Sequence, residues 1–154
     1  MQIASIGAPN MKPDMKKQEL SALLYEFLEV IYLFQKKEEG LFGVSWQEIY
    51  LLKKLNDEGS MSVGTIAKNL RSPLFGASRV VSRLTGLGLV KKTPARENKR
   101  LVNVEMTKAG NRLLKRVEDY QFRLITKNIN VLKAAEIESM FSGLAKLRAL
   151  LAIE

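Results

Sequence analysis

The sequence predicts a mainly α-helical protein that carries one small antiparallel β-hairpin. Most of the chain spaces its apolar residues three and four apart, which is the period of a helix that buries one face. A stretch that begins at residue 102 instead alternates apolar and polar residues, as a half-buried strand does. Glycines separate these segments and mark turns. A chain of 154 residues has room for one domain with a helical extension.

Two helices are expected before residue 60. The first spans about residues 15–39, and Gly40 and Gly43 are expected to bracket the loop that ends it. The second begins with Ser45 and Glu48, which have the spacing of a capping box, and Gly59 closes it. The apolar stripe of the first helix consists of Leu20, Leu24, Phe27, Ile31 and Phe34.

Two short helices and the hairpin follow. Ser62 is the expected N-cap of the third helix. Ser72 is expected to cap the fourth helix, with Pro73 in its first turn and its end near Thr85. Its inward stripe is Ala77, Val81 and Leu84. The expected strands cover residues 89–93 and 101–106.

Two further helices complete the chain. Thr107 is the expected cap of the fifth helix, which continues to about Ile125 and breaks near residues 128–130. The sixth helix has apolar residues seven apart. The expected division is a flexible tail (1–14), an N-terminal dimerisation helix (15–44), a winged domain (45–110) and C-terminal dimerisation helices (111–154).

The composition excludes several kinds of chemistry. The chain has no cysteine and no histidine, so thiol nucleophiles, disulfides, imidazole bases and thiolate or imidazole metal sites are excluded. No carboxylate pair or glycine-rich phosphate loop has a catalytic spacing, so we expect neither an enzyme nor a bound cofactor. The sequence has no membrane-length apolar run and no signal-peptide pattern, so a cytoplasmic protein without a membrane partner is expected.

Positive charge is concentrated in one segment. The chain has a net charge of +9. Residues 60–116 contain 13 basic and two acidic residues, a net charge of +11, so the remaining residues together are slightly acidic. Such a one-sided field is typical of a protein that binds a polyanion. The alternative is a basic face kept for solubility.

Two short helices followed by a basic hairpin have the arrangement of a winged helix-turn-helix. The second short helix of such a unit fits the major groove of double-stranded DNA, and the wing lies beside it. On the fourth helix the face opposite the inward stripe carries Phe75, Arg79 and Ser82, flanked by Ser78 and Arg83. The candidate DNA contacts are Ser72, Phe75, Ser78, Arg79, Ser82, Arg83, Arg96, Lys99 and Arg100. The alternative is that Arg79 and Arg83 are solvated helix residues.

Residues 45–110 resemble the MarR family of bacterial regulators, and with the flanking helices the resemblance extends over all but the first dozen residues. The segments that carry it are Met61-Ser62, Ile66-Ala67, Ser78-Arg79-Val80-Val81-Ser82-Arg83-Leu84, Gly88-Leu89-Val90, Asn98-Lys99-Arg100 and Val104-Glu105-Met106-Thr107-Lys108-Ala109-Gly110. The resemblance implies a homodimeric, DNA-binding transcriptional regulator, often a repressor that a small ligand releases.

The chain departs from the family at two places. The wing has Asn98-Lys99-Arg100 where the family usually has Asp-x-Arg, so the aspartate that orients a basic side chain is replaced by an amide. The fourth helix starts with Pro73-Leu74-Phe75-Gly76, where many members have polar residues. Phe75 either contacts thymine methyl groups or packs against the wing or another helix.

The end helices predict a homodimer, because their apolar stripes are larger than the central domain can cover. The expected interface residues are Leu20, Phe27, Ile31, Leu144, Leu147 and Leu151. An intramolecular helical layer is the alternative. The resemblance also implies a small-molecule effector, whose candidate contacts are the aromatic residues Phe27, Tyr32, Trp46 and Tyr50. The alternative is that these are core residues.

The function most consistent with the basic segment, the winged arrangement and the family resemblance is a ligand-responsive repressor that binds a pseudo-palindromic operator as a homodimer. The alternative is a winged-helix module for protein–protein contact, which would need an apolar rather than a basic exposed face.

Overall fold

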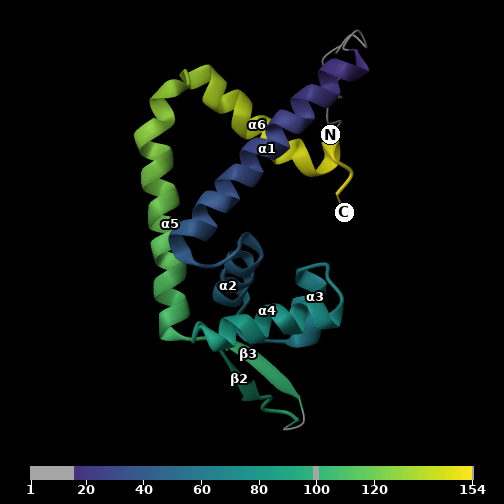
Figure 1. Ribbon diagram of the computed structural model, residues 1–154, viewed down its shortest axis with the longest axis vertical. Coiled ribbons are helices and arrows are strands. Elements are labelled where there is room, and N and C mark those ends of the chain that lie inside the picture. Colours follow the sequence, from purple (N-terminus) through teal and green to yellow (C-terminus); the bar gives the residue numbers. More distant parts are fainter. Residues whose placement is uncertain (1–15, 99–100, 154) are drawn as a thin grey trace, which may run out of the picture. The chain divides into compact units, whose positions relative to one another are not determined.

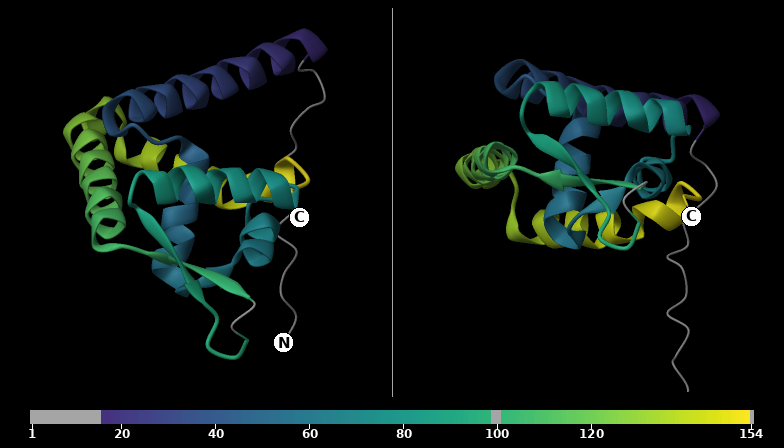
Figure 2. Two further views of the ribbon diagram at one scale, coloured as in Figure 1. Left: turned by 60° about the horizontal axis from the view of Figure 1, so that its bottom comes forward. Right: turned by 90° about the horizontal axis from the view of Figure 1, so that it is seen from below.

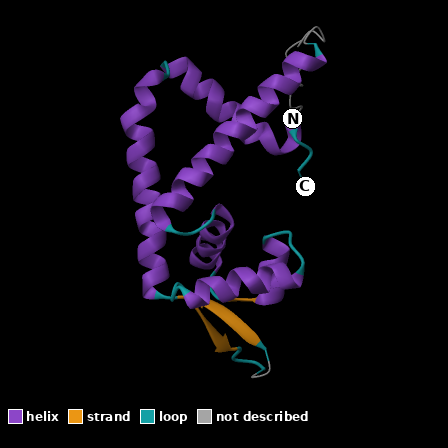
Figure 3. Cartoon of the chain, viewed as in Figure 1, coloured by secondary structure: helices purple, strands orange, loops and turns teal. Residues whose placement is uncertain are grey.

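The computed structural model describes residues 16–98 and 101–153. Within these ranges it has six α-helices, one 3-10 helix and three short strands, so the predicted mainly helical fold with a small antiparallel sheet is confirmed (Figures 1 and 3). Contacts divide the chain into two compact units, Met1–Leu51 and Leu52–Glu154. The predicted tail, residues 1–14, lies outside the described residues.

The first unit contains the long helix α1, Lys17–Phe42. It ends three residues later than expected, because Gly40 remains inside the helix. The chain leaves the helix at Gly43, which has a left-handed φ of 71° and donates its N–H to the Glu39 carbonyl oxygen at 2.9 Å. Glycine ends helices where this conformation is needed, and only the second of the two glycines adopts it.

Helix α2, Trp46–Glu58, begins in the first unit with the predicted capping box. The Ser45 N–H donates to Glu48 Oε2 at 2.7 Å, and the Glu48 N–H donates to Ser45 Oγ at 3.3 Å. These bonds satisfy two N–H groups at the helix start. Gly59 ends the helix with a φ of 82°, as expected.

In the second unit, helix α3, Val63–Asn69, has the predicted cap, since Ser62 Oγ accepts the Thr65 N–H at 3.1 Å. The predicted start of α4 is wrong. Helix α4 is Leu74–Gly86, and its N-cap is Pro73, whose ψ of 155° is extended rather than helical. Ser72 Oγ donates to the Pro73 carbonyl oxygen at 3.2 Å instead of capping the helix. Because Pro73 is itself extended, it occupies the N-cap position and Ser72 lies one residue before it.

The sheet has the order β1-β3-β2, with β1 Met61–Ser62, β2 Val90–Pro94 and β3 Val102–Met106, all antiparallel. The sequence predicted the hairpin of β2 and β3 but not β1, because two residues are too few to show a period. Pro94 lies in β2 rather than in the loop and pairs with Val102. It fits there because β2 is an edge strand, where a missing N–H is tolerated.

Helix α5, Lys108–Asn128, is capped by Thr107, as predicted. The Thr107 hydroxyl accepts the Gly110 N–H at 3.1 Å and donates to the Gly88 carbonyl oxygen at 2.7 Å, which joins the start of α5 to the end of α4. A 3-10 turn, Ile129–Val131, and helix α6, Ala134–Leu150, follow. The fully buried core of this unit includes Ile66, Ala77, Val81, Leu84 and Val104.

Gly110 provides a test of this packing. A Cβ atom at this position would collide with the carbonyl oxygen of Leu89 and lie 2.7 Å from Met106 Cγ. We therefore expect Gly110→Ala to destabilise the protein by about 1–3 kcal/mol through overpacking. Gly86→Ala is the control, because a Cβ there meets no atom within 4 Å. Thermal unfolding followed by circular dichroism measures both variants, and equal midpoints would contradict the close contact.

Candidate nucleic-acid interface

The outer face of α4, defined here as Phe75, Ser78, Arg79, Ser82 and Arg83, lies opposite a buried stripe. Ala77, Val81 and Leu84 are fully buried. All five outer residues except Ser78, which is half-buried, are exposed. The helical period therefore places the predicted candidates on the solvent side. Figure 1 shows α4 next to α3, with β2 and β3 extending from below α4.

The turn between α3 and α4 contains a basic residue in a strained conformation. Arg71 has a φ of 48°, in the left-handed region. The Arg71 N–H donates to the Lys68 carbonyl oxygen at 3.1 Å, and the Ser72 N–H donates to the Ala67 carbonyl oxygen at 3.0 Å. This pair of bonds is a Schellman motif, in which the left-handed position is usually glycine. An arginine there costs about 1 kcal/mol.

Sequence reasoning did not assign a role to Arg71. The signal that was available is the absence of glycine between Asn69 and Pro73, which forces the tight turn to use a residue with a side chain. Strained backbone is concentrated at functional sites. The exposed guanidinium of Arg71 is therefore a further candidate in this turn.

The hairpin carries the other part of the candidate interface. Arg96 is exposed next to Glu97 and Asn98, whereas the predicted contacts Lys99 and Arg100 lie outside the described residues. At the base of the hairpin, Glu105 accepts a hydrogen bond from the Thr93 hydroxyl at 3.2 Å and forms an ion pair with Lys91 at 3.3 Å. The left view of Figure 2 shows β2 and β3 extending away from α4 as a narrow ribbon.

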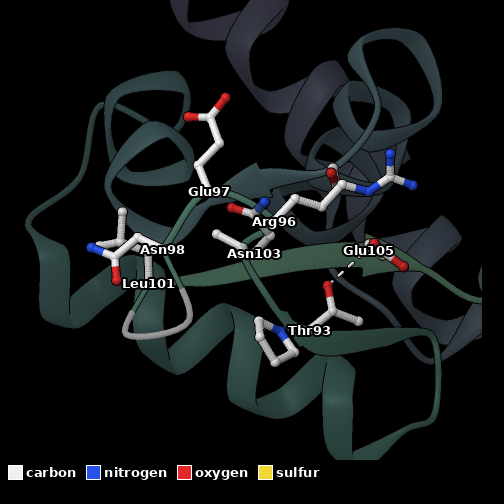
Figure 4. A pocket seen from close by; sticks show the side chains of 10 residues that line it. Thr93, Arg96, Glu97, Asn98, Leu101, Asn103 and Glu105 are labelled. Carbon is white, nitrogen blue, oxygen red and sulfur yellow. Dashed lines mark hydrogen bonds between the residues drawn. The ribbon is translucent and has the colours of Figure 1, made fainter.

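An open, polar cavity of about 410 Å³ lies beside the hairpin (Figure 4). Its lining includes Thr93, Arg96, Glu97, Asn98, Asn103 and Glu105. None of the four aromatic residues proposed to meet an effector lines this cavity. Among residues 16–98 and 101–153, no cluster of three or more carboxylates is placed to hold a metal ion.

The chain matches no family model. A curated relative, the uncharacterized HTH-type transcriptional regulator YfiV of Bacillus subtilis, is 22% identical over 130 residues, which are 84% of this chain and 81% of the relative. A MarR family protein from Bacillus stearothermophilus has a similar structure, with a TM-score of 0.69, 18% identity and coverage of 89% of this chain and 99% of that one. The chain has the fold of the MarR family.

Two further structures share this MarR fold. FabT of Streptococcus pneumoniae, solved in complex with DNA, has a TM-score of 0.73 at 18% identity and covers 89% of this chain and 98% of its own. BpsR of Bordetella bronchiseptica, studied for regulation of its DNA binding by 6-hydroxynicotinic acid, has a TM-score of 0.63 at 19% identity, with coverage of 85% and 98%. The fold predicted from the resemblance is confirmed by these similarities.

The end helices of this MarR fold expose their apolar residues. Of the six predicted interface residues, Leu20, Phe27, Ile31, Leu144 and Leu151 are exposed, and Leu147 is half-buried. Of the predicted effector residues, Phe27, Tyr32 and Trp46 are exposed and Tyr50 is half-buried. Phe27, Tyr32 and Trp46 are therefore not core residues of α1 and α2. In the described part of the chain, no helix has the length and apolar character needed to cross a membrane.

The strain at Arg71 predicts a difference in stability between two glycine variants. Arg71→Gly removes the left-handed strain, so we expect the variant to be as stable as the native protein or more stable by up to about 1 kcal/mol. Lys68→Gly is the matched control, because it also exchanges an exposed basic residue for glycine but lies inside α3. It should destabilise by about 1 kcal/mol. Chemical denaturation measures both, and an equal loss would contradict the strain at Arg71.

Proposed function

We propose that the chain is a sequence-specific DNA-binding transcriptional regulator. The observation that carries this proposal is the outer face of α4, which presents Arg79 and Arg83 to solvent within a segment of net charge +11. The fold supports it, since FabT, which has the same fold, was solved in complex with DNA. A basic helix face of this kind is suited to the major groove.

The residues of the outer face have different roles in this proposal. Arg79 lies at the centre of the face and donates to O6 and N7 of a guanine. Ser78 and Ser82 contact bases or phosphates on either side. Arg83, toward the C-terminal end of α4, and Ser72, which precedes the helix, contact the phosphate backbone in this proposal and position α4 without reading the sequence.

Phosphate contacts extend beyond α4 to the turn and the wing. Arg71 is exposed in the turn before α4, and Arg96 begins the tip of the hairpin. Lys99 and Arg100 complete the wing in this proposal. Each phosphate that such a residue neutralises releases counterions, so these contacts supply affinity rather than specificity.

The proposed active form is a homodimer. Helices α1 and α6 each expose apolar residues that a second copy of the chain can cover. A symmetric pair presents two α4 helices to a two-fold-related operator. The division into end dimerisation helices, residues 15–44 and 111–154, around a winged domain, residues 45–110, is part of this proposal.

The regulator is proposed to be a repressor that a small molecule releases. BpsR, whose DNA binding is regulated by 6-hydroxynicotinic acid, supports this assignment through its fold. The proposed contacts of such a ligand are Phe27, Tyr32, Trp46 and Tyr50. The first three are exposed aromatic side chains on α1 and α2, and Tyr50 is half-buried. No catalytic step is assigned to the chain. The protein–protein alternative is not favoured, because arginines occupy the centre of the outer face.

Arg79 tests the base-reading role. Arg79→Ala should weaken binding to the preferred site by about 1–3 kcal/mol for each lost contact and relax the preference at one base position per half-site. Fluorescence anisotropy with the selected site and with random DNA measures both effects. Lys127→Ala is the control, because Lys127 is an exposed basic residue near the C-terminal end of α5 and is not part of the proposed interface. If the Arg79 variant lost the same affinity for both DNAs, the side chain would contact phosphate only.

The dimer is tested in solution. Sedimentation equilibrium at micromolar concentration should give twice the 17.4 kDa mass of the chain. Leu144→Asp should shift the equilibrium toward the monomer, because a carboxylate would be buried without a partner. Lys146→Asp, on the opposite side of α6, should leave the mass unchanged. A 17.4 kDa species of the native protein at all concentrations would exclude the dimer.

A further inference from the structure

Two large apolar residues lie at the start of α4, within the basic segment formed by residues 60–116. Leu74 is 59% exposed and Phe75 is 69% exposed. These two residues, the apolar pair, are the first two residues of the helix. The exposed residues around them on the same turn and helix include the cations Arg71, Arg79 and Arg83. Two adjacent large apolar side chains that are exposed together form an apolar patch, and a patch of this kind is a candidate contact surface.

The position of Phe75 on the helix indicates which kind of partner contacts it. Phe75 precedes Arg79 by four residues, so the two side chains lie on the same face one turn apart. The rise of an α-helix makes this separation about 6 Å along the axis, which corresponds to about two base-pair steps of DNA. The flanking arginines complement a polyanion. An apolar protein partner would have to bury those charges, whereas DNA neutralises them.

The chemistry of the groove then limits what a phenyl ring can recognise. The edges of all four base pairs in the major groove present hydrogen-bond donors and acceptors, which a phenyl ring cannot use. The one apolar group there is the methyl on C5 of thymine. The same methyl group is present on 5-methylcytosine, at the same place in the groove.

We propose that Phe75, with Leu74 beside it, reads the 5-methyl group of a pyrimidine about two base pairs from the base that Arg79 contacts. This inference rests on the proposed DNA-binding function and adds a specific ligand group to it. It also assigns the departure from polar residues at the start of α4 to recognition. The preferred site should contain thymine at that position, and 5-methylcytosine should replace thymine there better than cytosine does.

The experiment removes only the methyl group. A preferred duplex is selected with the native protein from random DNA, and each thymine of a half-site is then replaced by deoxyuridine, which pairs identically. Burial of one methyl corresponds to about a fourfold change in affinity. The native protein should therefore lose about fourfold at one thymine of one half-site, and about 15-fold when both half-sites are changed.

The variants locate the effect. Phe75→Ala should bind the thymine and deoxyuridine duplexes equally, and Phe75→Leu should retain part of the discrimination. Leu87→Ala is the matched control, because Leu87 is also exposed but lies at the other end of α4. It should discriminate as the native protein does. At the sensitive position, 5-methylcytosine should bind about fourfold more tightly than cytosine to the native protein and no more tightly to Phe75→Ala.

Three results would overturn the inference while leaving DNA binding intact. The first is equal affinity of the native protein for thymine and deoxyuridine at every position. The second is a Phe75→Ala variant that still discriminates between them. The third is a Phe75→Ala variant whose oligomeric mass differs from that of the native protein, which would assign the ring to a contact between copies of the chain. Failure to select any preferred duplex would instead contradict the proposed function itself.

Discussion

The candidate interface depends on the burial of one side of α4. Ala77, Val81 and Leu84 are removed from water together with Ile66 and Val104, and this burial leaves the helix no freedom to rotate about its axis. The orientation of every residue on the other side follows from it. Arg79 is exposed because Val81 is buried, and a change that loosened the inner stripe would displace the arginine without touching it.

Local signals predicted the helix starts well and the turns poorly. Ser45, Ser62 and Thr107 cap their helices as expected, because a cap involves only the next three residues. The same reasoning failed at Ser72, where the extended backbone of Pro73 moves the helix start by one residue. It also ended α1 too early, because a glycine permits a left-handed conformation but does not impose it.

The candidate site was predictable to the extent that the helical period determines it. Once the buried stripe was recognised, the exposure of Phe75, Arg79, Ser82 and Arg83 followed. The absence of glycine between Asn69 and Pro73 was the only local signal of the strained turn, and it does not show which residue adopts the left-handed φ, which the structure places at Arg71. The two-residue strand β1 was missed for a similar reason, since it exists only through its pairing with β3. Roles that need a second copy, DNA or a ligand remain predictions.

Ser62 belongs to two elements at once. Its backbone pairs with Asn103 in the sheet, while its hydroxyl caps α3. At the other end of α3, the Asn69 side-chain amide donates to the Met61 sulfur at 3.4 Å, in the same two-residue strand. The base of the wing and α3 are therefore joined without a hinge between them. A conformational change that reaches this part of the molecule cannot bend the hairpin against α3 at low energy. It has to move them together, so in the proposed homodimer the variable left for control is the spacing and angle between the two copies of this joined unit.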